Sequence, residues 1–264
     1  MRRLITALVI AVAALASSHP ADAQDDSLAA IKARGKLIAG VKFDTPPFGF
    51  LDEKNEPVGF DIDLVRAIGR QIGVPVDLVA VTSPTRIPML ASGNVDLVAA
   101  SMTRTPEREQ AIDFSITYYT GGQSLLVPAS SKIRGVEDLA GKPVAVQQGT
   151  TLEKNLAAAA PKAEIVAFKD YNSAWLALRQ GRVDALTGSL NVLQGFAKDN
   201  RDFKIAGAPF SVEPFGIGVR KGATSLRDAV NATIRDLWTS GTYTELYHKW
   251  FGSHPVVPIE TAPK

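Results

Sequence analysis

Short apolar runs alternate with segments of helical period along most of the chain. The runs are six or seven residues long, and Gly, Pro or charged residues bound them. This pattern predicts strands buried on both faces, at residues 36–41, 75–81, 95–101, 142–147, 163–168, 183–188 and 215–220. Apolar spacing predicts helices between them, at residues 60–73, 83–93, 150–160, 171–181 and 225–241. The first helix carries one apolar stripe, made of Ile62, Val65, Ile68 and Ile72.

The order of these elements predicts an α/β fold with two lobes. Alternation of strand and helix is typical of parallel sheets flanked by helices. Two extended segments that contain Gly, residues 117–127 and 212–222, are suited to cross between the lobes. The first lobe is expected to comprise residues 27–122 plus 217–253, and the second lobe residues 123–216. A pair of such hinge crossings would let the lobes close over a cleft.

The first residues have the pattern of an export signal. Arg2 and Arg3 precede the apolar run 4–16, and small residues follow at Ala21 and Ala23, where signal peptidase cleaves after such residues. The apolar run is shorter than the ~20 residues that span a membrane. We therefore expect a signal peptide over residues 1–23 and an exported mature protein. The Pro-rich residues 254–264 predict a flexible tail.

Composition and charge exclude several classes of chemistry. The chain has 264 residues and a net charge of +2, so it lacks the strongly basic surface of a nucleic-acid-binding protein. It contains no Cys, which excludes thiol catalysis and disulfides. Of its three His, His19 lies in the expected signal peptide, and His248 is expected on an exposed helix face. We therefore expect no catalytic triad, no metal site and no cofactor.

The stretch ASMTRTPEREQ, residues 100–110, concentrates hydroxyl and guanidinium groups. Ser101, Thr103, Arg104, Thr105 and Arg108 lie within eight positions, and neither His nor Cys accompanies them. Because no general base accompanies them, such groups indicate that the segment binds an anion and does not catalyse a reaction.

Three further stretches carry a resemblance to a known family. Residues 59–72, GFDIDLVRAIGRQI, are similar to the signature of bacterial solute-binding proteins that serve polar-amino-acid ABC transporters. Residues 104–119, RTPEREQAIDFSITYY, and 146–155, VQQGTTLEKN, are similar to two other landmarks of that family, in the same order and spacing. The resemblance covers residues 37–252 or so. It implies a type II periplasmic binding protein, a two-lobed clamp that delivers its ligand to an inner-membrane ABC permease.

Paired carboxylates inside the first of these stretches have a structural explanation. Asp61 and Asp63 fall in the first turn of the expected helix, where negative charge complements the helix dipole. The resemblance likewise implies a structural role for both.

The resemblance also implies ligand-binding residues in both lobes. Arg108 would pair bidentately with the α-carboxylate of the ligand, since its planar fork of donors matches that group. Ser101 and Thr103 would line the same wall of the pocket. Thr150 and Thr151 would lie at a helix N-terminus of the second lobe, where free N–H groups and the dipole favour an anion. The carboxylate would thus be held from both lobes.

The resemblance extends to a branch of the family with acidic ligands. Residues 81–93, VTSPTRIPMLASG, are similar to the branch that binds glutamate or aspartate, in which Arg86 would meet a side-chain carboxylate. Lys42 occupies a position where a relative uses a basic residue. Binders of other amino acids tend to carry an aromatic residue near Ser83 and an acid near Lys42. Two cations predict a dicarboxylate ligand, because an unmatched buried charge is costly.

One position departs from the pattern of the family. Ser189 stands where amino-acid binders have an Asp that accepts hydrogen bonds from the α-ammonium, and a hydroxyl cannot neutralise a buried cation. Asp44, Asp170 or Glu213 would then have to supply the charge. Alternatively, Asn191 would bind the ammonium through water, or the ligand would be a dicarboxylate or keto acid without an ammonium.

Two other functions are compatible with the same scaffold. A lyase similar to cyclohexadienyl dehydratase would use Glu153 as a general acid. A sensor input domain would need signalling modules that this sequence does not contain. We expect neither, and instead predict a monomeric, non-enzymatic receptor whose partners are an amino acid or other carboxylate and an inner-membrane permease.

Overall fold

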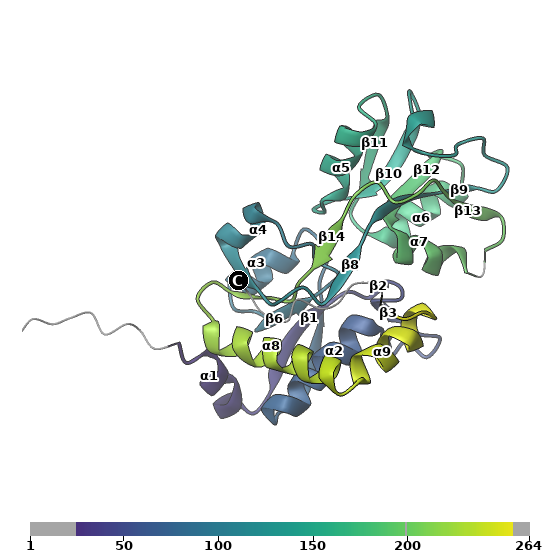
Figure 1. The fold of residues 1–264 in the computed structure, drawn as a ribbon. Coiled ribbons are helices and arrows are strands. Elements are labelled where there is room, and N and C mark those ends of the chain that lie inside the picture. The colour runs from purple at the N-terminus through teal and green to yellow at the C-terminus, as the bar shows by residue number, and fades with distance from the viewer. Residues whose placement is uncertain (1–24, 199, 256–264) are drawn as a thin grey trace, which may run out of the picture.

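A computed structural model describes residues 25–198 and 200–255 of the chain, and these residues form two lobes (Figure 1). Each lobe is built on a five-stranded sheet with helices around it. The predicted signal peptide lies outside the described residues, as does the predicted tail beyond Pro255.

The first lobe contains most of the N-terminal half and the C-terminal helices. Its sheet has the order β5-β1-β6-β15-β7, in which β5, β1 and β6 are parallel and β15 is antiparallel to β6 and β7. The strands are β5 (Val76–Ala80), β1 (Leu37–Val41), β6 (Leu97–Ala99), β15 (Gly218–Arg220) and β7 (Ile112–Phe114). The helices are α1 (Ser27–Arg34), α2 (Phe60–Ile72), α3 (Arg86–Ala91), α4 (Pro106–Ala111), α8 (Thr224–Thr239) and α9 (Thr242–Phe251). A small antiparallel sheet joins β2 (Asp44–Thr45), β3 (Gly49–Leu51) and β4 (Pro57–Val58).

The second lobe repeats this plan with a shorter chain. Its sheet has the order β11-β10-β12-β9-β13, with β9 antiparallel to both β12 and β13. The strands are β11 (Glu164–Phe168), β10 (Pro143–Gln147), β12 (Ala185–Ser189), β9 (Gln123–Pro128) and β13 (Phe203–Ala206). The helices are the 3₁₀ turn η1 (Val136–Asp138), α5 (Leu152–Ala159), α6 (Tyr171–Arg179) and α7 (Leu190–Ala197).

Two short antiparallel strands run between the lobes (Figure 1). They are β8 (Tyr119–Gly121) and β14 (Glu213–Phe215), and they fall within the two segments that the sequence predicts as crossings. Tyr119 and Phe215 face each other in the register, and their rings lie 5.2 Å apart between centroids. Both rings also pack against Phe48 of the first lobe. The crossings are therefore fixed to the first lobe by an aromatic cluster.

The predicted strands and helices occur in the predicted order, with two corrections. Residues 75–81 and 163–168 were expected to be buried on both faces, and this is wrong, because β5 and β11 are edge strands with exposed residues. The sheets are also mixed rather than parallel, since each gains antiparallel strands next to the crossings. The predicted apolar stripe of α2 is confirmed, because all four of its residues are buried.

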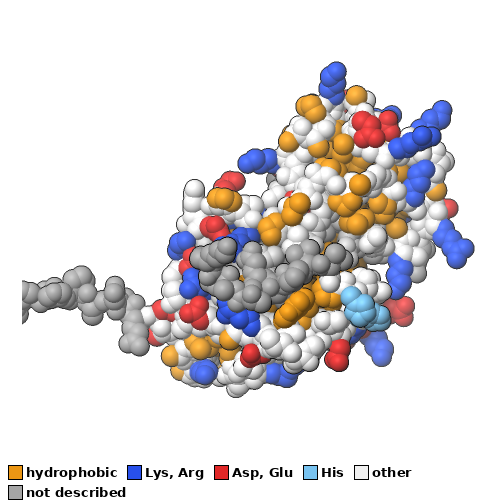
Figure 2. Space-filling view, viewed as in Figure 1, with side chains coloured by type: hydrophobic (Ala, Val, Ile, Leu, Met, Phe, Trp, Pro, Cys, Tyr) orange, Lys and Arg blue, Asp and Glu red, His pale blue; other side chains and the backbone are white. Residues whose placement is uncertain are grey.

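The surface agrees with the small net charge. On the face in Figure 2, basic and acidic side chains are scattered over both lobes. His248 is exposed, as predicted, and its ring lies 5.6 Å from that of His254. Within residues 25–198 and 200–255, no helix is long and apolar enough to cross a membrane, and no cluster of acidic or His side chains could hold a metal ion.

Candidate ligand-binding cleft

A small cavity of ≈ 30 Å³ lies between the lobes, next to the crossing strands. Seven of the nine residues that the sequence proposes for the site line it: Ser83, Arg86, Ser101, Thr103, Thr150, Thr151 and Ser189. Lys42 and Arg108 are not part of its lining. The remaining lining residues are Gln147, Leu152, Tyr171, Val192, Glu213 and Phe215.

Ser101 enters the cavity wall from a left-handed backbone conformation. Its φ is 41°, and its N–H donates to Asp61 Oδ2 at 2.7 Å. Tyr118 donates its hydroxyl to the other carboxylate oxygen, also at 2.7 Å. Burial raises the pKa of Asp61 to about 7. Through its hydrogen bonds Asp61 positions Ser101 from within the same lobe, a structural role that differs from the predicted complement to the helix dipole.

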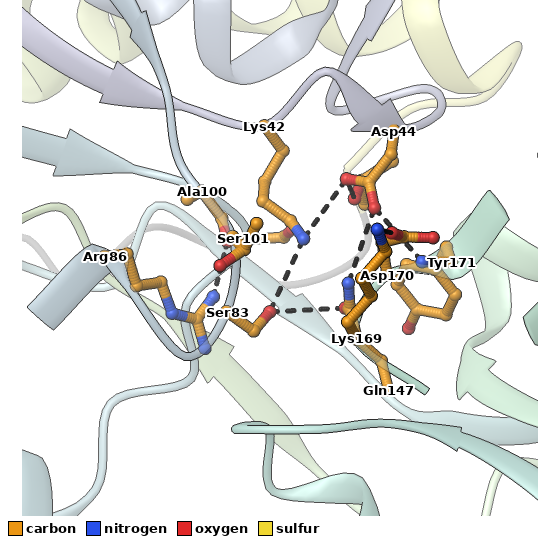
Figure 3. Close-up of polar contacts among 12 residues, drawn as sticks. Lys42, Asp44, Ser83, Arg86, Ala100, Ser101, Gln147, Lys169, Asp170 and Tyr171 are labelled. Atoms are coloured by element: carbon orange, nitrogen blue, oxygen red, sulfur yellow. Dashed lines mark hydrogen bonds and ion pairs between the residues drawn. The ribbon is translucent and has the colours of Figure 1, made fainter. Parts of the chain in front are cut away.

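Arg86 is a buried cation whose guanidinium group forms few hydrogen bonds. It begins α3, is 2% exposed, and donates from Nη1 to the carbonyl of Ala100 at 2.7 Å (Figure 3). Its Nε is buried and has no hydrogen-bond partner among the described residues. Burial lowers the pKa of Arg86 to about 9, and the nearby Arg108 adds to this shift. The side chain therefore has a donor and a charge to offer to the cavity.

Arg108 connects the two lobes through backbone carbonyls. Its Nη1 donates to Thr103 O at 2.6 Å in the first lobe, and its Nη2 donates to Gly149 O at 3.3 Å in the second. Thr105 caps the short helix α4 and accepts from the backbone N–H of Arg108. Burial lowers the pKa of Arg108, an effect that the carboxylate of Glu213 opposes.

Glu213 is the centre of a second set of contacts between the lobes, which we call the hinge network. Its Oε2 accepts from the hydroxyls of Thr103 at 2.5 Å and Thr151 at 2.7 Å. Its Oε1 accepts from Asn155 Nδ2 and, at 3.0 Å, from Ser211 Oγ. The carboxylate is 3% exposed, and these four donors are neutral. Their hydroxyl oxygens keep lone pairs, so Thr103 and Thr151 can accept from a ligand in the cavity.

Lys42 is buried and forms an ion pair with a neighbouring carboxylate. Its Nζ lies 3.2 Å from Asp44 Oδ1, and the residue is 1% exposed. Thr150 lies before α5, where its Oγ1 donates to Gln147 O at 2.6 Å and accepts from the N–H of Leu152 at 3.3 Å.

Comparison with known proteins identifies the chain's family. Residues 37–253 match the model of the bacterial extracellular solute-binding proteins, family 3. The chain belongs to this family.

Individual relatives agree with the assignment. The chain is 40% identical to an ABC transporter glutamine-binding protein of Bacillus subtilis, over 89% of this chain and 88% of the relative. It is 33% identical to an L-glutamate/L-aspartate-binding protein of Pseudomonas aeruginosa, over 97% and 88%. An ancestral arginine-binding protein solved with glutamine superposes with a TM-score of 0.80, at 40% identity, over 83% of this chain and 99% of the other. The protein is thus an amino-acid ABC transporter solute-binding protein of the type II fold.

Within this family 3 protein, the carboxylates near Ser189 have distinct partners. Ser189 ends β12, and its buried Oγ has no partner in the described part of the chain. Asp44 pairs with Lys42, and Asp170 caps α6 by accepting from Ser173 N at 2.7 Å. Of the three acids that the sequence offered for an α-ammonium, Glu213 alone lines the cavity.

The sequence did not single out five of the lining residues, of which Gln147 and Tyr171 carry polar groups. Gln147 ends β10, two positions before the GTT segment, and Tyr171 begins α6. Ends of parallel strands and starts of helices gather at the cleft edge of an α/β lobe, so their positions were an available signal. Glu153, the acid that a lyase would use, is half-buried in α5 and is not among the residues that line this cavity.

Proposed function

We propose that this solute-binding protein captures glutamate or aspartate in the periplasm by closing its two lobes, and delivers it to an inner-membrane permease. The observation that carries the proposal is the pairing of opposite charges on the cavity wall. Arg86 offers an unpartnered guanidinium N–H, and Glu213 supports hydroxyl acceptors. A carboxylate next to Arg86 and an ammonium next to Thr103 and Thr151 satisfy both.

Charge balance favours an acidic amino acid. Three cations lie at or beside the cavity, namely Lys42, Arg86 and Arg108, against the carboxylates of Asp44 and Glu213. Burial raises the pKa of Asp61 to about 7, so below that pH this carboxyl group is mostly protonated and is counted as neutral. One positive charge is left over, and a ligand with a net charge of −1 cancels it.

Glutamine is the second candidate, and a specific contact favours it. Asp44 already neutralises Lys42, so the side-chain end of the site does not require a carboxylate. Gln147 and Ser83 offer both donors and acceptors there, which suits an amide. The similar protein of Bacillus subtilis is named for glutamine binding.

A ligand without an ammonium and a lyase activity both agree less well with these contacts. A dicarboxylate or keto acid would bring no ammonium to the hydroxyl acceptors that Glu213 supports. A lyase would need a general acid at the cavity, and Glu153 does not line it. We propose a monomeric receptor without enzymatic activity, cofactor or nucleic-acid partner.

A thermal-shift comparison on refolded mature protein tests the proposal. L-glutamate, L-aspartate, L-glutamine, 2-oxoglutarate and succinate are compared at equal concentration. A ligand at about 100 times its Kd adds close to 3 kcal/mol of stability. We expect the largest shift with glutamate or aspartate and none with the two compounds that lack an ammonium.

A matched variant separates specific binding from general stabilisation. Arg86→Met keeps an unbranched, apolar stem but removes the buried charge and the guanidinium donors. The variant should unfold at a temperature no lower than the original protein and lose the ligand-induced shift. A shift that persists in Arg86→Met, or a preference for 2-oxoglutarate or succinate, would contradict the proposed site.

A further inference from the structure

Four side chains form a closed polar ring across the cleft (Figure 3). Lys42 Nζ lies 3.2 Å from Asp44 Oδ1 and 3.5 Å from Ser83 Oγ. Ser83 Oγ donates to Gln147 Oε1 at 3.2 Å, and Gln147 Nε2 lies 3.5 Å from Asp44 Oδ2, which completes the ring. Lys42, Asp44 and Ser83 belong to the first lobe, and Gln147 belongs to the second. We call these four residues the polar ring.

Asp44 also reaches a helix of the opposite lobe. Its Oδ2 accepts from the backbone N–H of Tyr171 at 3.1 Å, the first residue of α6. A carboxylate at this end of a helix is favoured by the free N–H groups and the dipole. Asp44 thus has four partners: Lys42, Gln147, the start of α6 and the hydroxyl of Thr45, which donates to its Oδ1 at 2.9 Å.

The polar ring lies directly behind the cavity wall. Ser83, Gln147 and Tyr171 line the cavity, whereas Lys42 and Asp44 stand behind them. Lys42 is almost fully buried, which lowers the pKa of its ammonium, while the charge of Asp44 opposes this shift. The protein therefore places its own ammonium–carboxylate pair at one end of the ligand cavity.

We infer that Lys42 takes the place of a ligand's cationic side chain, so that the polar ring excludes arginine and lysine from the cavity. This inference rests on the proposed function, since it assumes that the cavity binds an amino acid. An arginine or lysine side chain that reached this wall would meet the charge of Lys42, and the carboxylate of Asp44 is already occupied. Uncharged or acidic side chains meet the hydroxyl of Ser83 and the amide of Gln147 without that repulsion.

Removing the charge of Lys42 should convert the site into one that binds amino acids with a cationic side chain. Lys42→Met deletes the charge and shortens the side chain, which leaves the negative charge of Asp44 without a cation and able to pair with a guanidinium or ammonium group. The double variant Lys42→Met/Asp44→Asn lacks both charges and should lose this new ability. The two variants therefore differ in the carboxylate that a cationic ligand would use.

Isothermal titration calorimetry with L-glutamate, L-glutamine, L-arginine and L-lysine provides the test. The original protein should bind arginine and lysine about 100-fold more weakly than its preferred amino acid, which is the size expected of close like charges. Lys42→Met should recover most of that factor for arginine or lysine. The double variant should return to weak binding of both.

The outcomes distinguish this inference from the proposed function. If the original protein binds none of the four amino acids, the proposed function fails, and the inference with it. If glutamate or glutamine binds Lys42→Met but arginine and lysine do not, the inference alone is overturned. Tight binding of arginine or lysine by the original protein would also overturn it. Lys42→Gln, which removes the charge but keeps a polar partner for Asp44, decides the question should the Met variant fail to fold.

Discussion

Two polar networks join the lobes, and they differ in how their charges are balanced. The polar ring contains one cation, Lys42, and one carboxylate, Asp44, so its charge is cancelled within the protein. The hinge network contains the carboxylate of Glu213, and the donors that it accepts from, among them Thr103 and Thr151, are neutral. A carboxylate that is paired directly with a cation is stabilised within the protein. A carboxylate whose hydrogen-bond donors are neutral, with the charge of Arg108 only nearby, gains more when a ligand cation arrives. Contacts of similar geometry thus serve different purposes.

The largest expected effect is on ligand affinity, after a change in the hinge network. Glu213→Gln keeps the size of the side chain but removes the negative charge that supports the hydroxyl acceptors. Affinity for glutamate and glutamine, measured by titration calorimetry, should fall by about 100-fold, since one partner of a buried charge pair is lost. An unchanged affinity would show that the α-ammonium is neutralised elsewhere in the site.

The corresponding change in the polar ring should act on stability instead. Asp44→Asn leaves Lys42 buried without its counter-charge, and the free energy of unfolding should fall by about 2 kcal/mol. The side chain of Asp44 is 15% exposed, so the loss should be smaller than for a fully buried pair. Denaturation with urea measures the effect. The double variant Lys42→Met/Asp44→Asn should recover most of the loss, and failure to recover would mean that the pairing with Lys42 does not explain it.

A carboxylate that lies within a single lobe gives a reference for both networks. Burial raises the pKa of Asp61 from 3.8 to about 7, so the folded protein holds a proton that the unfolded chain has released. Stability should therefore fall as the pH rises from about 4 to about 7, with a loss of about 1 kcal/mol between pH 6 and pH 7. Asp61→Asn should flatten this part of the curve of unfolding free energy against pH. An unaltered slope in the variant would assign the pH dependence to another group.

Local pattern in the sequence predicted the order of elements and the two crossings. Apolar period and turn residues report on neighbours within a few positions, and these decide where α2 or β10 begins and ends. The same pattern could not tell edge strands from central ones, because the position of β5 and β11 depends on pairing with distant strands. The mixed direction of the sheets depends on the same long-range pairing.

Predictions about the site differed in the same way. Residues at the ends of strands and the starts of helices, such as Ser101 and Thr151, were located by their motifs and do line the cavity. The roles of charged groups depended on partners far away in the sequence. Glu213 bonds to Thr103, 110 positions earlier, and the occupation of Asp44 by Lys42 and Tyr171 appears only when the lobes are placed together. Charge balance at the site therefore depends on how the two lobes are placed together.

The smallest expected effect is steric, and it touches neither network. Gly195 lies inside α7, and a Cβ at this position would lie 3.0 Å from the carbonyl oxygen of Pro46 in the other lobe. Gly195→Ala should favour the helix by about 0.5–1 kcal/mol, because Ala has the higher helix propensity. It should also resist close approach of the lobes and weaken binding of every ligand by about threefold.

The variant should therefore raise the stability of the protein and lower its affinity for ligands. The two measurements together test whether binding needs close approach of the lobes. Thermal unfolding without ligand and calorimetric titration with glutamate and glutamine measure the two quantities on one preparation. Higher stability combined with equal weakening for both ligands would show that binding requires the contact between α7 and Pro46 and is independent of ligand charge. If the affinities for glutamate and glutamine fall by different factors, the Gly195 contact acts through one of the two polar networks. Shape and charge would then not contribute separately. Gly195 therefore tests whether shape and charge contribute separately to closure.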